Sequence, residues 1–146
     1  VMELKLGYAG LFGYATGAVI QNLGIESGTV MGYTRSAAFA AVIQKGTVIR
    51  NCYNKAMVYA DTDSGAFVSM ESNADAVVEN CYNMGVVNAK KRGNNSAGLI
   101  GYLASDATDF VLRNCYNVGN RYAFMGSVNH RCRNRKLLQR RHREHH

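Results

Sequence analysis

Long apolar runs, sustained helical periodicity, proline and tryptophan are all missing from this 146-residue chain. No apolar run reaches 18 residues, so we expect no transmembrane helix and no insertion into a membrane. No window before the last residues keeps an apolar period of 3.6 residues, which argues against long helices. All four histidines fall within the last 17 residues. The cysteines elsewhere therefore have no histidine in their repeat, and we expect no metal site and no cofactor.

A repeated tetrapeptide is the most informative feature that the sequence does contain. Asn-Cys-Tyr-Asn occurs three times, at intervals of 29 and 34 residues, and each copy follows an apolar pair and one variable residue. Self-similarity at such a period indicates an array of stacked units. The copies are Asn51-Cys52-Tyr53-Asn54, Asn80-Cys81-Tyr82-Asn83 and Asn114-Cys115-Tyr116-Asn117, with a weaker first copy at Asn22-Leu23-Gly24.

A second repeated element lies upstream of each tetrapeptide and consists of an apolar pair between small residues. Its copies are Gly10-Leu11-Phe12-Gly13, Ala37-Ala38-Phe39-Ala40, Gly65-Ala66-Phe67-Val68, Gly98-Leu99-Ile100-Gly101 and Ala123-Phe124-Met125-Gly126. The stretch between the two elements is polar and varies in length. Variable insertions at one point of a repeat form surface loops on one face of the stack.

Each unit has the composition of short strands and turns, because segments rich in Val, Ile, Tyr and Phe alternate with Gly, Asn, Asp and Ser. A single unit of about 30 residues cannot bury an apolar face, whereas stacked units can. We therefore predict an all-β fold, an elongated β-solenoid of about four to five rungs over residues 1–129. In-register rungs would lie about 4.8 Å apart. Their asparagine amides would form ladders and their tyrosine rings would stack.

The tetrapeptide also predicts a corner in the chain. Ile49 and Cys52 would point to opposite faces of a regular strand. If both point inward, the chain must turn near Asn51, and asparagine tolerates the left-handed conformation that such a corner needs. The three repeat cysteines then share one column. Because their Cβ vectors are parallel, we expect buried free thiols and no disulfide.

The segments Gly98–Tyr102 and Arg113–Gly119 resemble the GLUG-type repeats of bacterial cell-surface proteins and adhesins, which also occur outside the catalytic part of IgA-specific metallopeptidases. The resemblance covers about residues 7–126, although the first two units depart from the pattern. It implies an extracellular, cell-surface or cell-wall location and a structural or adhesive role, with a host or cell-surface protein or glycan as partner. No His-Glu-x-x-His motif is present, so the zinc peptidase activity of that relative is not expected here.

Acidic residues are the remaining candidates for catalytic groups. Asp61, Asp63, Asp75, Asp106 and Asp109 lie in loops that would form an acidic strip if the loops stack. General acid–base catalysis needs two carboxylates at a defined separation, and no such pair recurs at one repeat position. We therefore expect solvated loop carboxylates and assign no catalytic residue. The alternatives are a loose calcium site in the segment that begins at Asp61, and a carbohydrate-active β-helix enzyme or glycan-binding module with its acids on the loop face.

Residues 130–146 differ from the rest of the chain, because they hold seven of its 17 Lys and Arg residues but one of its ten acids. They also stand where a fifth Asn-Cys-Tyr-Asn is due. With permitted codons, a one-base shift over Arg131 to Arg141 gives Ala-Ala-Glu-Ile-Glu-Asn-Cys-Tyr-Asn-Val-Gly. We interpret this tail as a frameshifted repeat, from a sequencing error, a cloning slip or a natural mutation, followed by tag residues.

The basic charge therefore does not indicate a nucleic-acid partner, because it belongs to the shifted frame and to a solvated loop at Lys90-Lys91-Arg92. The chain begins within the repeat pattern and shows no signal peptide, so we expect a fragment of a longer array. Solenoid ends are unpaired sheet edges, and we also expect end-to-end self-association through them.

Overall fold

The protein is a β-solenoid. The computed structural model describes residues 7–71, 75–89, 96–104, 109–119 and 125–128. These residues form twenty short β-strands and no helix, which confirms the predicted all-β class. Each of the first three turns of the coil adds one strand to each of five sheets, named A to E in chain order. Neighbouring strands within every sheet are parallel.

The strands of each sheet come from equivalent positions of successive turns. Sheet A contains β1 (Tyr8–Ala9), β6 (Arg35–Ala37), β11 (Asp63–Gly65) and β16 (Ser96–Ala97). Sheet B contains β2 (Phe12–Ala15), β7 (Ala40–Ile43), β12 (Val68–Glu71), β17 (Ile100–Leu103) and β20 (Met125–Val128). Sheet C contains β3 (Val19–Gln21), β8 (Val48–Arg50), β13 (Val77–Glu79) and β18 (Val111–Arg113).

The last two sheets complete each turn. Sheet D contains β4 (Gly24–Ile25), β9 (Tyr53–Asn54), β14 (Tyr82–Asn83) and β19 (Tyr116–Asn117). Sheet E contains β5 (Thr29–Gly32), β10 (Met57–Ala60) and β15 (Val87–Ala89). The described sheets therefore hold three to five strands each, in agreement with the predicted four to five rungs.

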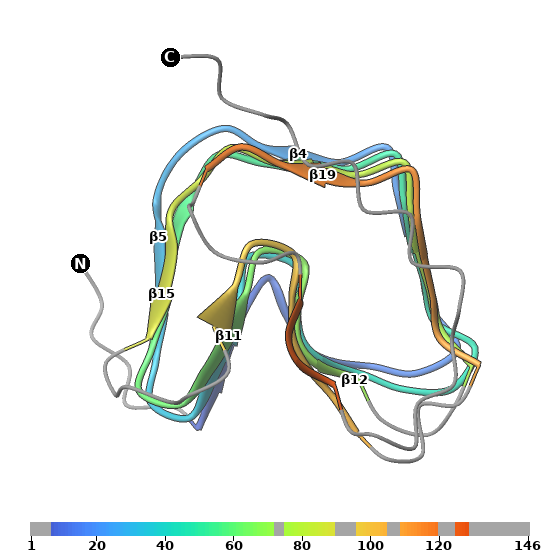
Figure 1. Ribbon diagram of the computed structural model, residues 1–146, viewed down its shortest axis with the longest axis horizontal. Helices are drawn as coiled ribbons and strands as arrows, with labels where there is room; N and C mark the ends of the chain where they lie inside the picture. The colour runs from blue at the N-terminus through green and yellow to red at the C-terminus, as the bar shows by residue number, and fades with distance from the viewer. Residues whose placement is uncertain (1–6, 72–74, 90–95, 105–108, 120–124, 129–146) are drawn as a thin grey trace.

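Figure 1 looks along the stack and shows that the coil is indented. Sheets D and E form two outer sides of the outline, and the chain folds inward where β11 of sheet A meets β12 of sheet B. This view is down the shortest axis of the molecule. Four to five rungs span only about 20 Å at about 4.8 Å each, so the described segment is wider than it is long. An elongated outline would require further rungs.

The indentation explains the small residues of the second repeated element. Sheets A and B approach each other there so closely that a Cβ at Gly65 would lie 2.1 Å from the carbonyl oxygen of Val68. Ser69 bridges the same two strands, donating its hydroxyl to the carbonyl of Asp63 at 2.8 Å. Larger side chains at these positions would push the two sheets apart.

The tip of the indentation carries apolar side chains into the core. Phe39 and Phe67 are fully buried and stack with their ring centroids 5.0 Å apart. They belong to one core cluster with Ile49, Val78 and Leu99, among other buried residues. The solenoid is therefore filled by side chains that occupy equivalent positions of successive rungs.

Two register expectations for the second repeated element were wrong. The first copy matched Phe12 with Phe39, but Phe12 pairs with Ala40. The repeat comparison matched Gly65 with Gly98, but the sheets pair Gly65 with Ala97 and Val68 with Ile100. Phe67 therefore lies level with Leu99. The physical reason is that the close approach of sheets A and B requires only a small residue. Alanine meets this requirement as well as glycine, so the positions of the glycines do not define the register.

Candidate functional site

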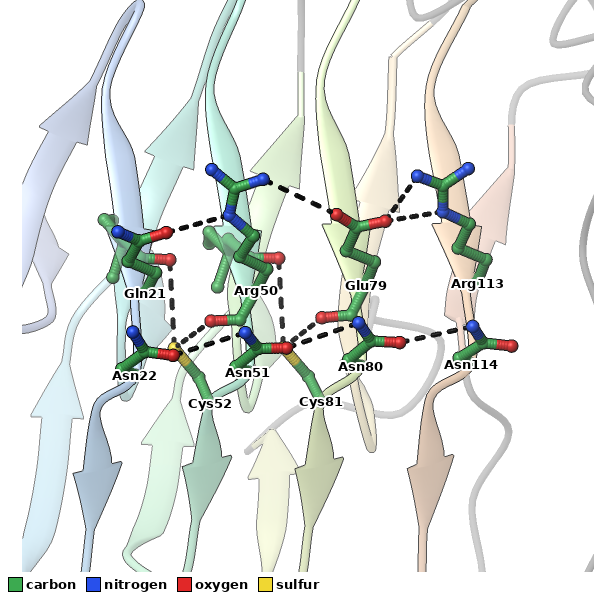
Figure 2. A network of polar contacts seen from close by, with 12 residues as sticks. Gln21, Asn22, Arg50, Asn51, Cys52, Glu79, Asn80, Cys81, Arg113 and Asn114 are labelled. Carbon is green, nitrogen blue, oxygen red and sulfur yellow. Dashed lines mark hydrogen bonds and ion pairs between the residues drawn. The ribbon is translucent and has the colours of Figure 1, made fainter.

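The first asparagine of each tetrapeptide forms an exposed amide ladder at the corner between sheets C and D (Figure 2). Asn22, Asn51, Asn80 and Asn114 have φ between 50 and 56°, in the left-handed region expected at this corner. Nδ2 of each of the last three donates to Oδ1 of the preceding one at 3.2 Å. The first, weaker repeat copy therefore contributes a full member of the ladder.

The left-handed corner buries the residues on both sides of it. Ile49 has an exposed fraction of 0 % and Cys52 of 1 %, although they are three residues apart. Both therefore point into the core, as the corner required. Asparagine is not branched at Cβ and carries a hydrogen-bonding amide, so it suits both the left-handed corner and the ladder.

The residue before each of these asparagines forms a column of polar and charged side chains (Figure 2). Nε of Arg50 donates to Oε1 of Gln21 at 2.9 Å, and its Nη1 lies 4.0 Å from Oε1 of Glu79. Nε of Arg113 donates to Oε2 of Glu79 at 2.5 Å. The charges therefore alternate along the last three rungs. In the sequence this position looks merely variable, and the alternation of charge at it is the signal that would have predicted the column.

The cysteines form a buried column of free thiols inside the same corner. Each Sγ lies 3.1–3.2 Å from the carbonyl oxygen two residues earlier, where the thiol donates a weak hydrogen bond. The thiols of Cys115 and Cys52, together with burial, raise the pKa of Cys81 above its ordinary value. A buried thiol in this state acts as a small apolar filler and is a poor nucleophile.

The tyrosines stack on the outer side of sheet D. Tyr53 and Tyr82 have ring centroids 5.3 Å apart, and Tyr82 and Tyr116 have centroids 5.0 Å apart, with interplanar angles of 10° and 5°. The ring of Tyr53 covers Gly24, where a Cβ would lie 2.1 Å from Cζ of the ring. The faces of these rings are therefore largely covered by contacts within the stack.

The first tyrosine of the column also makes a polar contact. Its hydroxyl donates to the carboxylate of Glu26, to which Lys55 also donates at 3.2 Å. The hydrogen bond to Glu26 raises the pKa of Tyr53. The hydrogen bonds from Tyr53 and Lys55 lower the pKa of Glu26.

The second asparagine of each tetrapeptide forms a separate, buried ladder. Nδ2 of Asn54 donates to Oδ1 of Asn83 at 2.9 Å, and Nδ2 of Asn83 donates to Oδ1 of Asn117 at 2.8 Å. Asn83 also accepts from the backbone N of Gly85 at 3.0 Å and donates to its carbonyl oxygen at 2.8 Å. The side-chain amide of Asn83 therefore forms hydrogen bonds with the backbone of the turn that follows it as well as with the asparagines of the neighbouring rungs.

The described carboxylates do not form one acidic strip. Asp61 and Asp63 lie where sheet E passes into sheet A, whereas Asp75 and Asp109 both stand two residues before the start of a sheet C strand. Asp63 forms an ion pair with Arg35 at 3.3 Å, and Oδ1 of Asp75 accepts from the backbone N of Gly46 at 3.1 Å. Within the described residues no group of three or more His, Cys, Asp or Glu side chains is arranged to hold a metal ion.

Several expected features lie outside the described residues, namely Asp106, the basic loop Lys90-Lys91-Arg92 and the tail from His130 to His146. In the part of the chain that the structure describes, no helix is long and apolar enough to span a bilayer.

Comparisons with protein-family models, with curated proteins and with solved structures found no match. The described geometry therefore carries the functional argument alone. In that geometry, every member of the repeated tetrapeptide contacts its counterpart in a neighbouring rung or the backbone close to it.

Proposed function

We propose that the chain is a non-enzymatic structural and adhesive repeat segment of a bacterial cell-surface protein. The supporting observation is that the repeated side chains bind one another along the stack, through two amide ladders, a tyrosine stack and a column of ion pairs. Residues that hold rungs together are what a rod requires, whereas a catalytic site requires polar groups that converge on a substrate.

The adhesive part of the proposal rests on the turns between the rungs. The number of residues between the strands of sheets B and C increases along the chain, from residues 16–18 to 44–47, 72–76 and 104–110. The strands of sheets E and A are separated by two residues at 33–34, by two at 61–62 and by six at 90–95. A constant scaffold that carries turns of unequal length is a common way to present recognition loops.

The enzymatic alternative has less support from the described residues. Glu26, Asp63, Asp75 and Glu79 each bind a side chain or backbone group of the protein itself. The tyrosine faces that a sugar ring would stack on are largely occupied by neighbouring tyrosines. We therefore favour a rod that presents loops over a glycan-cleaving groove.

A binding and hydrolysis screen separates these functions. The labelled protein is applied to a glycan array and to host epithelial cells, and its release of sugar from the same glycans is measured. The matched control replaces residues 104–110 by the short turn of residues 16–18, with the melting midpoint checked for both proteins.

We expect binding that weakens in the short-turn variant, with no release of sugar. Binding by neither protein would reduce the function to that of a spacer. Sugar release that is lost on replacing Asp75 and Asp109 by asparagine would contradict the non-enzymatic proposal.

A further inference from the structure

The three repeat cysteines have the same side-chain geometry in successive rungs. The strands on both sides of them pair in register, because Arg50 lies level with Glu79 and Tyr53 with Tyr82. Each Sγ lies 3.1–3.2 Å from the carbonyl oxygen two residues earlier and 3.7–3.8 Å from a carbonyl oxygen of the preceding rung. The side chains therefore point the same way, as Figure 2 shows for the first two cysteines. One rung spacing, about 4.8 Å, separates neighbouring sulfurs.

This spacing is too wide for a disulfide but matches a linear metal complex. A disulfide needs its sulfurs about 2 Å apart, and parallel Cβ vectors do not bring them together. Soft metal ions prefer thiolate ligands, and a metal–thiolate bond is about 2.3 Å long. An ion midway between two thiolates therefore holds the sulfurs about 4.6 Å apart. The rungs provide this separation with little movement of the backbone.

The surroundings of the column restrict both the ligand number and the net charge of such a site. Cys52 and Cys81 are each 1 % exposed and belong to the apolar core cluster with Ile49 and Val78. A buried net charge is costly, whereas a divalent ion with two thiolates is neutral. In the described part of the chain no three His, Cys, Asp or Glu side chains surround one point, so an ion that needs four ligands, such as zinc, has no place.

We propose that two neighbouring thiols of the cysteine column form a linear, two-coordinate site for a soft divalent metal ion of the chemical class of mercury(II). Binding breaks two S–H bonds and forms two metal–sulfur bonds, and the two protons pass to the solvent. Cys81 belongs to both neighbouring pairs, with Cys52 or with Cys115, so the column holds one ion in this form. The lack of a histidine in the repeat argues against zinc-type sites and does not bear on a site of two thiolates.

Three variants with equal numbers of column thiols test the site in the full chain. All carry Cys132→Ser, because Cys132 is the one cysteine outside the column. Cys52→Ser and Cys115→Ser each keep one neighbouring pair, whereas Cys81→Ser leaves two thiols two rungs, about 9.6 Å, apart. Cys81→Ala is also prepared, so that the comparison does not depend on the folding of one variant.

Each protein is dialysed against mercury(II) chloride buffered by an excess of a small monothiol, and in parallel against zinc(II). Dialysis continues until the metal content is constant, because buried thiols are reached only when the rungs open locally. Bound metal is counted by elemental mass spectrometry, and X-ray absorption gives the number of sulfur ligands. Circular dichroism before and after loading checks that the β-sheets are retained.

We expect one mercury ion per chain in Cys52→Ser and in Cys115→Ser, with two sulfur ligands and unchanged circular dichroism. Both variants at Cys81 should bind at least about tenfold more weakly, because the second bond is then no longer made within a prearranged pair. No protein should retain zinc.

Equal retention of mercury with and without Cys81, or retention by none of the proteins, would overturn the proposal. Three or more sulfur ligands, or loading that removes the β-sheet signal, would overturn it as well. These outcomes concern the core of the solenoid, and the adhesive function is measured separately with glycans and cells.

Discussion

The buried amide ladder should be the most sensitive point of the fold, and Asn83→Leu tests it. Asn83 is fully buried and takes part in four hydrogen bonds, with Asn54, Asn117 and both backbone groups of Gly85. Leucine has a similar size, so it leaves little space for a water molecule to replace the amide. The substitution therefore removes the partners without opening a wet cavity.

The magnitude follows from the groups left unpaired. The N–H and C=O of Gly85 and one amide hydrogen of Asn54 lose their partners, and each unsatisfied buried group costs about 1–3 kcal/mol. We expect the free energy of unfolding to fall by about 5 kcal/mol, a large part of the roughly 5–15 kcal/mol that stabilises an ordinary domain. Urea titration followed by circular dichroism measures this loss.

Asn80→Gly is the matched control on the same rung. Glycine adopts the left-handed conformation of Asn80 readily, and the lost ladder bonds are exposed, so water replaces them. We expect a loss of about 1 kcal/mol or less. If Asn83→Leu costs no more than Asn80→Gly, the buried ladder is not a main source of stability and our account of the tetrapeptide is wrong.

Three further predictions follow from other contacts. The repeat cysteines are buried, so they should react slowly with a thiol reagent until denaturant is added, and a disulfide between Cys52 and Cys81 in a mass map would contradict this. Gly65→Val should lower the melting midpoint, since its Cβ would meet a carbonyl oxygen at 2.1 Å and such overpacking costs about 1–3 kcal/mol or more; an unchanged midpoint would refute the close contact. Glu26→Gln should lower the pKa of Tyr53 toward its ordinary value in a carbon-13 NMR titration of the phenol ring, and an unchanged value would exclude the hydrogen bond as its cause. Because the folded pKa of Glu26 is lowered, its contribution to stability is present above its unfolded pKa and is lost as the pH falls through the folded value.

The sequence predicted the parts of the fold that depend on identical residues. Asn51 and Tyr82 have chemically equivalent neighbours one rung away, so a count of residues is enough to place them in columns. The corner at Asn51 could also be predicted, because Ile49 and Cys52 cannot both be buried on a regular strand. These inferences need only the period of the repeat.

Other features depend on which surfaces meet, and the repeat alone does not show this. The inward fold between sheets A and B is marked only by small residues such as Gly65 and Ala97, and small residues are equally common in turns. The roles of the two asparagines in each tetrapeptide also differ, with Asn80 exposed and Asn83 buried. The sequence alone does not show which of the two is buried, because the corner that separates them is a property of the folded chain.

Cross-strand nuclear Overhauser effects around β13 distinguish a stack of parallel rungs from other β folds. In the stacked solenoid, backbone protons of Val78 show effects to both Ile49 and Leu112, in the pattern of parallel strands, because Val78 pairs with both. Strong effects between α-protons of facing residues, which antiparallel strands produce, or contact with only one of the two neighbours, would contradict the stacked solenoid.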